Sequence, residues 1–148
     1  MAKAPFRVVL SGDFRKTDGS PTFPDFDISP LLNQPGLDCQ YLERGAEIRA
    51  AQVADADALI LLTPRFTKNS IHPNGRLAVV ARFGVGYDSV EVPACTAAGI
   101  AVVITPDGVR RPVAVAILTY ILALSGKLMV KDRITRDGPP GWAKKTDH

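Results

Sequence analysis

The sequence predicts an α/β fold: a doubly wound, parallel, five-stranded sheet followed by a long C-terminal crossing helix. Short apolar runs of strand length recur along the chain, and helix-like stretches separate them. Several of these runs are apolar almost without interruption, which is typical of strands that are covered on both faces. Because strands that alternate with helices are joined by right-handed crossovers, the sheet is expected to be parallel.

Five apolar runs are predicted to form the strands, and a flavodoxin-like strand order of 2-1-3-4-5 fits their number. The predicted strands are residues 6–10, 37–42, 58–62, 78–83 and 101–104. The predicted connecting helices are residues 27–33, 48–54, a weak stretch at 67–76, and 91–98. The sequence HPNG at residues 72–75 interrupts the weak stretch, so any helix there is expected to be short. Gly99 stands where the left-handed end of a helix favours glycine.

A different pattern follows the fifth predicted strand. The sequence TPDG at residues 105–108 predicts a turn, and Pro112 suits the first turn of a helix. From Val113 to Leu124 the chain reads VAVAILTYILAL, which is apolar on every face, so this helix is expected to be buried on every side. The apolar stretch is too short to cross a membrane. The sequence therefore predicts that another domain or a second subunit covers it.

Composition and charge exclude several other classes of protein. With 46% hydrophobic residues, twelve glycines and twelve prolines, the 148-residue chain is neither collagen-like nor of low complexity. Neither a long uninterrupted apolar run nor a signal peptide is found, so no membrane span is expected and a cytoplasmic location is predicted. The net charge of +3 comes without a basic stripe, so no nucleic-acid partner is expected. The basic excess in residues 127–148 is interpreted as a solvated tail.

Cysteine and histidine are scarce. Cys39 and Cys95 are far apart in the sequence and lie in apolar settings, so buried thiols are predicted rather than a disulfide. His72 and His148 are interpreted as surface residues, and the sequence contains neither a metal-binding pattern nor a nucleophile elbow. No residue of this chain is therefore predicted to be catalytic, and no metal is expected.

The most informative motif is RFGVGYD at residues 82–88, which begins at the carboxyl end of the fourth predicted strand. In open α/β sheets, ligands bind outside the carboxyl ends of the strands. Glycines let the backbone turn its N–H groups outward, so the amides of Val85 and Gly86 are candidates for binding a small carboxylate or phosphate. The alternative is that Gly84 and Gly86 serve only the strand-to-helix turn. Because position 89 is Ser89, the third glycine of a dinucleotide loop is absent.

A second candidate follows the third predicted strand. Arg65, in the sequence TPRFT, is expected at the same edge of the sheet, where its guanidinium can bind a carboxylate through two parallel hydrogen bonds. The alternative is a solvated surface arginine. Arg110 and Arg111 precede the long helix, where positive charge is unfavourable, and they are interpreted as surface or interdomain contacts.

Several segments are distinctive when they are taken together: ARFGVGYDSVEV at residues 81–92, AAGIAV at 97–102, TP at 105–106 and the long apolar helix. They resemble the D-isomer-specific 2-hydroxyacid dehydrogenases, a family that includes phosphoglycerate dehydrogenase. The resemblance implies two Rossmann-like domains with a cleft between them. It assigns residues 1–108 to the substrate-binding (catalytic) domain, 109–136 to an interdomain and dimerisation helix, and 137–148 to a tail or a linker to a missing nucleotide-binding domain.

The resemblance also implies a ligand. The amides of Val85 and Gly86 are implied to hold the carboxylate of a small 2-hydroxy or 2-oxo acid, with Arg65 bordering the pocket. The G-x-G-x-x-G loop of the family and its catalytic arginine, glutamate and histidine have no counterpart in this sequence. NAD or NADP is therefore expected only in the complete enzyme, and the chain alone is expected to be inactive.

The resemblance has departures and an alternative. Ser89 and Val115 stand where many members of the family have asparagine and glutamate, and Trp142 resembles the aromatic residue ahead of the nucleotide domain. The apolar helix at residues 113–124 is implied to form a homodimer contact. The alternative to a dehydrogenase is a stand-alone module that binds a small carboxylate, or regulates through it, without catalysis.

Overall fold

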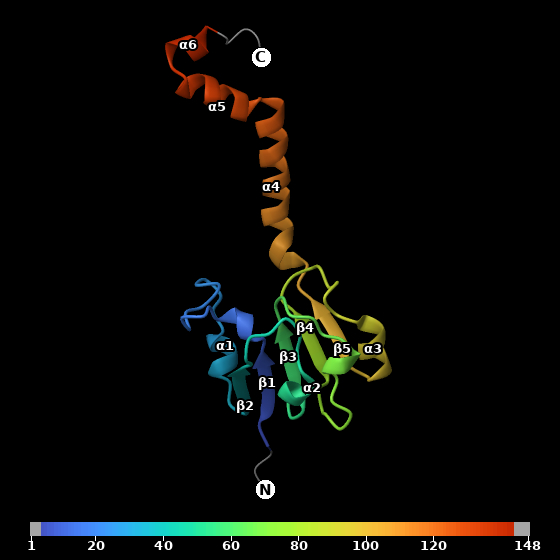
Figure 1. Ribbon diagram of the computed structural model, residues 1–148. Helices are drawn as coiled ribbons and strands as arrows, with labels where there is room; N and C mark the ends of the chain where they lie inside the picture. Colours follow the sequence, from blue (N-terminus) through green and yellow to red (C-terminus); the bar gives the residue numbers. More distant parts are fainter. Residues whose placement is uncertain (1–3, 144–148) are drawn as a thin grey trace. The chain divides into compact units, whose positions relative to one another are not determined.

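The computed structural model describes residues 4–143. The chain divides after Pro106 into two compact units, Met1–Pro106 and Asp107–His148, and each is described by itself. The first unit is built on one parallel sheet, whose order β2-β1-β3-β4-β5 confirms the predicted doubly wound α/β fold (Figure 1). Its strands are β1 (Phe6–Leu10), β2 (Leu37–Tyr41), β3 (Ala58–Leu61), β4 (Val79–Arg82) and β5 (Ala101–Ile104).

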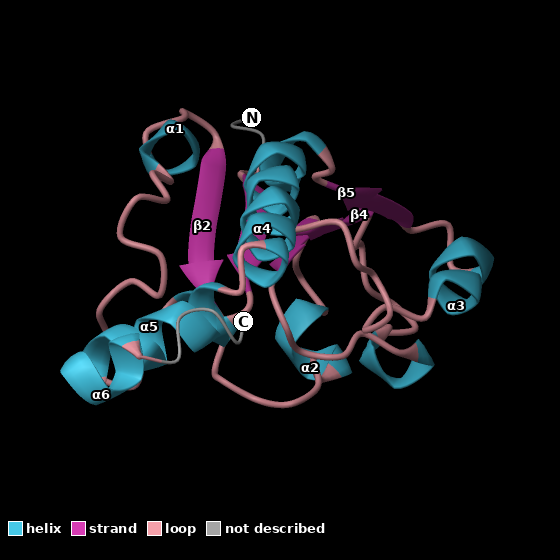
Figure 2. Ribbon diagram, turned by 90° about the horizontal axis from the view of Figure 1, so that it is seen from above, coloured by secondary structure: helices cyan, strands magenta, loops and turns pink. Residues whose placement is uncertain are grey.

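Short helices connect the strands. They are α1 (Ser29–Leu32), α2 (Ala50–Val53) and α3 (Val92–Ala97), with the 3-10 turns η1 (Gly12–Phe14) and η2 (Lys68–Ser70). Figure 2 shows α1 on one side of the sheet and α2 and α3 on the other. The helices predicted at 27–33 and 48–54 are longer than α1 and α2, and the stretch 67–76 contains only η2. Gly99 has the left-handed backbone expected after α3, with φ of +70°.

The side chains of the strands alternate between two apolar layers. On the side of α2 and α3, the layer includes Val9, Val53, Leu59, Leu61, Phe66, Val80 and Cys95. On the side of α1, it consists of Leu10, Phe14 and Leu62, with Phe26, Tyr41, Ile60 and Phe83 packed against them. Both cysteines are free, as predicted, but only Cys95 is fully buried, and Cys39 is half-buried. Burial raises the pKa of the Cys95 thiol, and the charge of Glu91 adds to the rise.

One part of the sheet stays uncovered among the described residues of the first unit. Ala101 and Val103 in β5 lie on the side of the sheet that carries α1, and Val103 keeps 49% of its surface exposed. The helix on that side, α1, packs against β2 at the opposite edge of the sheet. Parallel sheets are normally covered on both faces, so the surface of β5 needs a cover from outside this unit.

The second unit contains α4 (Asp107–Ser125), α5 (Leu128–Arg136) and α6 (Pro139–Trp142). The turn predicted over residues 105–108 and the first-turn position predicted for Pro112 are wrong, because α4 begins at Asp107 and Pro112 lies inside it. Asp107 places a negative charge at the start of the helix and pairs with Arg110 at 2.9 Å. A carboxylate at this end opposes the partial positive charge of the first turn, which stabilises the early start.

The segment at residues 109–136, which the resemblance assigned to one interdomain helix, contains two helices, α4 and α5. Lys127, between α4 and α5, has a left-handed backbone with φ of 51°, and it follows Gly126. A helix cannot continue through a left-handed residue, so α5 starts anew. Residues 144–148, which include Lys144, Lys145 and His148 of the predicted tail, lie outside the described residues.

Eight large apolar side chains of α4 are more than half exposed. They are Val113, Val115, Ile117, Leu118, Tyr120, Ile121, Leu122 and Leu124. By length and composition alone, α4 is also the one described helix that is long and apolar enough to cross a membrane, with a mean hydropathy of 1.4. Its uninterrupted apolar stretch, residues 113–124, extends about 18 Å at about 1.5 Å per residue, against about 30 Å for the hydrocarbon core of a bilayer. This length favours a protein cover over a lipid one, and the absence of a membrane span stays a prediction.

Candidate functional site

The carboxyl ends of β1, β3 and β4 are neighbours at one edge of the sheet, and the loops that leave them form the candidate site. Asp13 ties the ends of β1 and β3 together, because its carboxylate accepts hydrogen bonds from Ser11 Oγ (2.6 Å) and from the N–H (3.0 Å) and hydroxyl of Thr63. Ser11 is fully buried, and its Oγ accepts a hydrogen bond from the N–H of Leu62 at 3.0 Å. This network fixes one wall of the site.

The loop after β4 presents backbone amides to the same edge. Gly84 has φ of +139°, which L-residues rarely adopt, so this position requires glycine. Three hydrogen bonds hold it: its N–H donates to Thr105 Oγ1 at 2.8 Å and to the carbonyl of Arg82 at 3.0 Å, and its carbonyl accepts from the N–H of Thr105 at 2.9 Å. The N–H groups of Val85 and Gly86, by contrast, donate to no other described residue. These two amides are therefore free to bind an anion.

Gly84 and Gly86 differ in which of the two interpretations, a role in the turn or a role in binding an anion, fits their geometry. The left-handed backbone of Gly84 serves the turn, as the plainer alternative proposed. Gly86 has no such φ, and a Cβ there would meet its nearest neighbour, Asp88 Oδ2, at an ordinary 3.7 Å. Neither a turn nor close packing demands glycine at position 86. A small side chain would therefore fit at position 86 without a clash.

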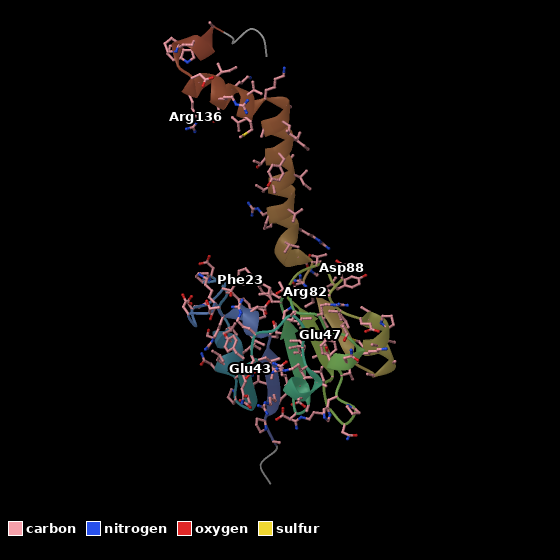
Figure 3. All side chains as sticks on the ribbon, in the orientation of Figure 1. Phe23, Glu43, Glu47, Arg82, Asp88 and Arg136 are labelled. Atoms are coloured by element: carbon pink, nitrogen blue, oxygen red, sulfur yellow. The ribbon has the colours of Figure 1, made fainter. Side chains whose placement is uncertain are left out.

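A cavity of about 250 Å³ lies beside this loop. It is lined by Leu62, Thr63, Arg82, Gly86, Asp88 and Ser89. Figure 3 shows Arg82 and Asp88 at the edge of the sheet where the strands end. Arg82 forms no ion pair with the described residues, and its buried Nε has no hydrogen-bond partner among them, while Nη1 donates to the carbonyl of Phe83. The lining of the cavity thus contains one unpaired cation, Arg82, which attracts an anion, and one carboxylate, Asp88, which opposes that attraction.

Arg82 is a site residue that the sequence analysis did not assign. It was treated only as the start of the motif at residues 82–88. The signal was present in the sequence, because a charged residue that ends an apolar strand of a parallel sheet stands at the ligand-binding edge.

Arg65 is not brought into this cavity. Its backbone pairs with the preceding segment, since its N–H donates to the carbonyl of Ala46 and its own carbonyl accepts from Ile48, both at 2.9 Å. Its side chain is exposed and is not part of the cavity lining. Gly86 lines the cavity, Gly84 and Val85 precede it in the same loop, and a role for Arg65 in binding stays a prediction.

The described part of the chain offers an anion site without an evident proton shuttle. It contains no cluster of histidine, cysteine, aspartate and glutamate that could hold a metal ion. His72 lies in the loop before β4, where its Nδ1 accepts a hydrogen bond from the N–H of Asn74 at 3.2 Å. The site can therefore hold and orient a small acid through two amides and one guanidinium.

The hydroxyl of Thr105 is predicted to maintain the conformation of the loop after β4 (residues 83–88), called the anion loop. Replacing Thr105 with valine keeps the branched shape of the side chain but removes the shorter of the two hydrogen bonds of the Gly84 N–H, which costs about 1 kcal/mol, and leaves the bond to the carbonyl of Arg82 at 3.0 Å. We expect the amide proton of Gly84 to exchange with solvent several-fold faster in Thr105→Val, as measured by NMR. Thr105→Ser keeps the hydroxyl and serves as the control. Equal exchange rates in all three chains contradict the prediction.

The chain is similar in sequence to known proteins. The family described as "D-isomer specific 2-hydroxyacid dehydrogenase, catalytic domain" matches residues 27–116. Over 100 residues, the chain is 35% identical to a glyoxylate reductase of Thermococcus gammatolerans and 36% identical to that of Thermococcus kodakarensis. In both cases the match covers 67% of this chain and 29% of the relative, so the chain spans about 29% of the length of these relatives.

Solved structures have the same fold. The TT0316 protein from Thermus thermophilus superposes with a TM-score of 0.65 at 26% identity, over 89% of this chain and 40% of that protein. A 3-phosphoglycerate dehydrogenase from Entamoeba histolytica, solved with NAD+ bound, gives a TM-score of 0.61 at 21% identity, over 81% of this chain and 39% of that one. At that identity the second likeness concerns the fold alone.

Proposed function

Because the chain belongs to the D-isomer-specific 2-hydroxyacid dehydrogenase family, we propose that it forms the substrate-binding part of an oxidoreductase that interconverts 2-hydroxy acids and 2-oxo acids. The complete enzyme would use NAD or NADP, which accepts or supplies the hydride. This chain would contribute one wall of the substrate cleft and, through the apolar side chains of α4, a contact with a nucleotide-binding domain and with a second copy of itself.

The observation that supports the proposal is the pair of free amides at Val85 and Gly86 beside Arg82. The carboxylate of the acid would accept a hydrogen bond from each amide, and the guanidinium would oppose its charge. Fixing the carboxylate also fixes the neighbouring carbon, which carries the hydroxyl or oxo group. The role of this chain is therefore to orient the substrate for a reaction whose other groups it does not supply.

The chain's own residues do not fit a dinucleotide. In dinucleotide-binding α/β folds, the glycine-rich turn after the first strand takes the pyrophosphate. Here that turn contains Gly12, and a Cβ at Gly12 would lie 2.5 Å from the carbonyl oxygen of Leu42 and 2.6 Å from the nitrogen of Arg44. The backbone of residues 42–44 thus fills the space that a pyrophosphate needs. We propose that the chain alone binds no nicotinamide cofactor and is inactive.

One alternative function has support from the same site. A module that binds a small carboxylate without chemistry needs the amides and the guanidinium but no group that transfers a proton. The described site contains neither histidine nor cysteine, which fits that alternative. The two functions differ in whether the carboxylate site takes part in hydride transfer when a nucleotide-binding domain of this family is added.

An NMR titration of the isotopically labelled chain tests the proposal. Glycolate, pyruvate and glyoxylate are expected to shift the amide signals of Val85 and Gly86, whereas glycolamide, which has the same size and no carboxylate, is not. The chain mixed with NADH or NADPH and glyoxylate is expected to show no oxidation of the cofactor. Unshifted amides at positions 85 and 86, or measurable cofactor oxidation, would overturn the proposal.

A further inference from the structure

A second cavity, of about 540 Å³, adjoins the carboxylate site. Leu62 and Thr63 line both cavities, so the two meet at the end of β3. Away from this shared wall, the second cavity is lined by polar and charged side chains, among them Lys16 and Arg44, and by the ring of Phe23. The two cavities are therefore neighbours that share part of one wall.

Lys16 is presented by a small ordered hairpin. Arg15 and Pro21 form an antiparallel bridge, and the N–H of Lys16 donates to the carbonyl of Ser20 at 2.8 Å. At the tip, Asp18 accepts hydrogen bonds from the hydroxyl (2.6 Å) and N–H (2.9 Å) of Ser20, which lower the pKa of that carboxyl. The hairpin thus has a defined conformation, which fixes the position of the Lys16 backbone beside the cavity.

Phenylalanines fasten this hairpin to the anion loop. Phe83, which directly precedes Gly84, packs against Phe14, Phe23 and Phe26 with ring centroids 5.4, 5.6 and 4.7 Å away. Phe14 and Phe23 flank the hairpin on either side in the sequence. The second cavity and the free amides are therefore parts of one connected structure.

Arg44 is brought to the cavity by the close approach at Gly12. Because Gly12 has no side chain, the backbone of residues 42–44 lies directly against the end of β1. The Nη1 of Arg44 then donates to the carbonyl of Arg15 at the base of the hairpin. This bond engages one of the five guanidinium N–H groups and leaves the others available.

Lys16 and Arg44 have no carboxylate partner among the described residues. The arginines that do form ion pairs there are Arg7, Arg49, Arg76, Arg110 and Arg136. The one carboxylate that lines the second cavity is that of Asp13, which already accepts hydrogen bonds from Ser11 and Thr63. The lining of the second cavity therefore contains two positive charges and one negative charge, and this excess of positive charge attracts an anion.

We propose, on the basis of the proposed function, that the second cavity binds a second anionic group of the substrate. The substrate would then be a 2-hydroxy or 2-oxo acid with a carboxylate on the Val85 and Gly86 amides and a further carboxylate or phosphate between Lys16 and Arg44. A guanidinium and an ammonium bind both kinds of anion. A monocarboxylate such as pyruvate leaves this cavity without an anion.

The test compares ligands with one and two anionic groups on the full chain. Pyruvate, 2-oxoglutarate and 3-phosphoglycerate are titrated while the NMR signals of the loop amides and of the hairpin are followed. At least one of the two dianionic acids is expected to bind about tenfold or more tightly than pyruvate, since charge-assisted bonds are the strong ones. Which of them binds better shows whether the second group is a carboxylate or a phosphate.

Variants test whether Lys16 and Arg44 cause the preference for dianionic acids over pyruvate. The double variant Lys16→Gln/Arg44→Gln is expected to lose the roughly tenfold preference for the dianionic acid while shifts with pyruvate persist. Arg49→Gln, which removes an exposed cation paired with Glu43, is the matched control and should keep the preference. A preference that survives in the double variant, or equal affinities in the unchanged chain, overturns this inference alone. Loop amides that respond to none of the acids overturn the proposed function instead.

Discussion

An alanine at position 84 is expected to weaken the binding of glycolate to the loop amides by on the order of 10- to 100-fold. The φ of Gly84 is +139°, and holding a side chain in so rare a conformation costs about 1–3 kcal/mol. The new Cβ would also collide with Nη1 of Arg82, which would then have to leave the carbonyl of Phe83 and its place in the cavity. The NMR shifts of Val85 and Gly86 on titration with glycolate measure the loss.

A matched control separates this local effect from a general cost of replacing glycine. Gly99 also has a left-handed backbone, with φ of +70°, but a Cβ there would meet no atom within 4 Å. Gly99→Ala is expected to lower the free energy of unfolding by about 1–2 kcal/mol and to leave glycolate binding intact. If Gly84→Ala binds glycolate as tightly as Gly99→Ala does, the shape of the loop does not depend on Gly84.

The strands and their order were predictable because they depend on local pattern. The runs that became β1, β3 and β4 are mostly apolar, and such runs have few alternatives in a chain of this composition. The order in the sheet was predicted because the flavodoxin-like order fits five strands, and the structure has that order. Helix lengths were overestimated, because α1 and α2 are single turns whose ends are set by packing against the sheet.

The start of the long helix shows where local signals mislead. Pro112 is common in the first turn of helices, and the glycine at position 108 is typical of turns, so both favoured a late start. The helix nevertheless begins at Asp107, which pairs with Arg110, and it continues through Pro112 without the hydrogen bond that proline cannot donate. Charges and turn residues at a helix end contribute about 1 kcal/mol or less each, so they do not by themselves locate the start of a helix.

Some residues of the candidate site were predictable from the sequence, and others were not. The anion loop was predictable, because Gly84, Val85 and Gly86 follow a strand in sequence and so stand at the carboxyl edge of the sheet. The position of Lys16 was not, since it depends on a hairpin that docks through aromatic contacts with Phe83, nearly seventy residues later. Arg44 likewise reaches its cavity through a backbone contact at Gly12 that no local pattern encodes.

Charges introduced into α4 are expected to abolish self-association of the chain. Leu118 and Leu122 are one helical turn apart on the same face and are 59% and 69% exposed. We propose that this face pairs with a second copy, and burying each leucine contributes about 1.5–3 kcal/mol. Leu118→Lys/Leu122→Lys removes that contribution from both copies and is expected to weaken the dimer by at least about 100-fold, as measured by sedimentation equilibrium.

The matched control for this prediction is Leu32→Lys in α1, because Leu32 is 52% exposed and lies in the first unit. It is expected to leave the association constant unchanged. Lipid vesicles added to the unchanged chain provide a second comparison: residues 113–124 extend about 18 Å, too short for a bilayer core of about 30 Å, so the chain is expected to stay in the supernatant when the vesicles are sedimented. A chain that is monomeric at concentrations on the order of 100 μM, where even weak dimers form, contradicts pairing through α4. A chain that pellets with the vesicles shows instead that its apolar face is covered by lipid.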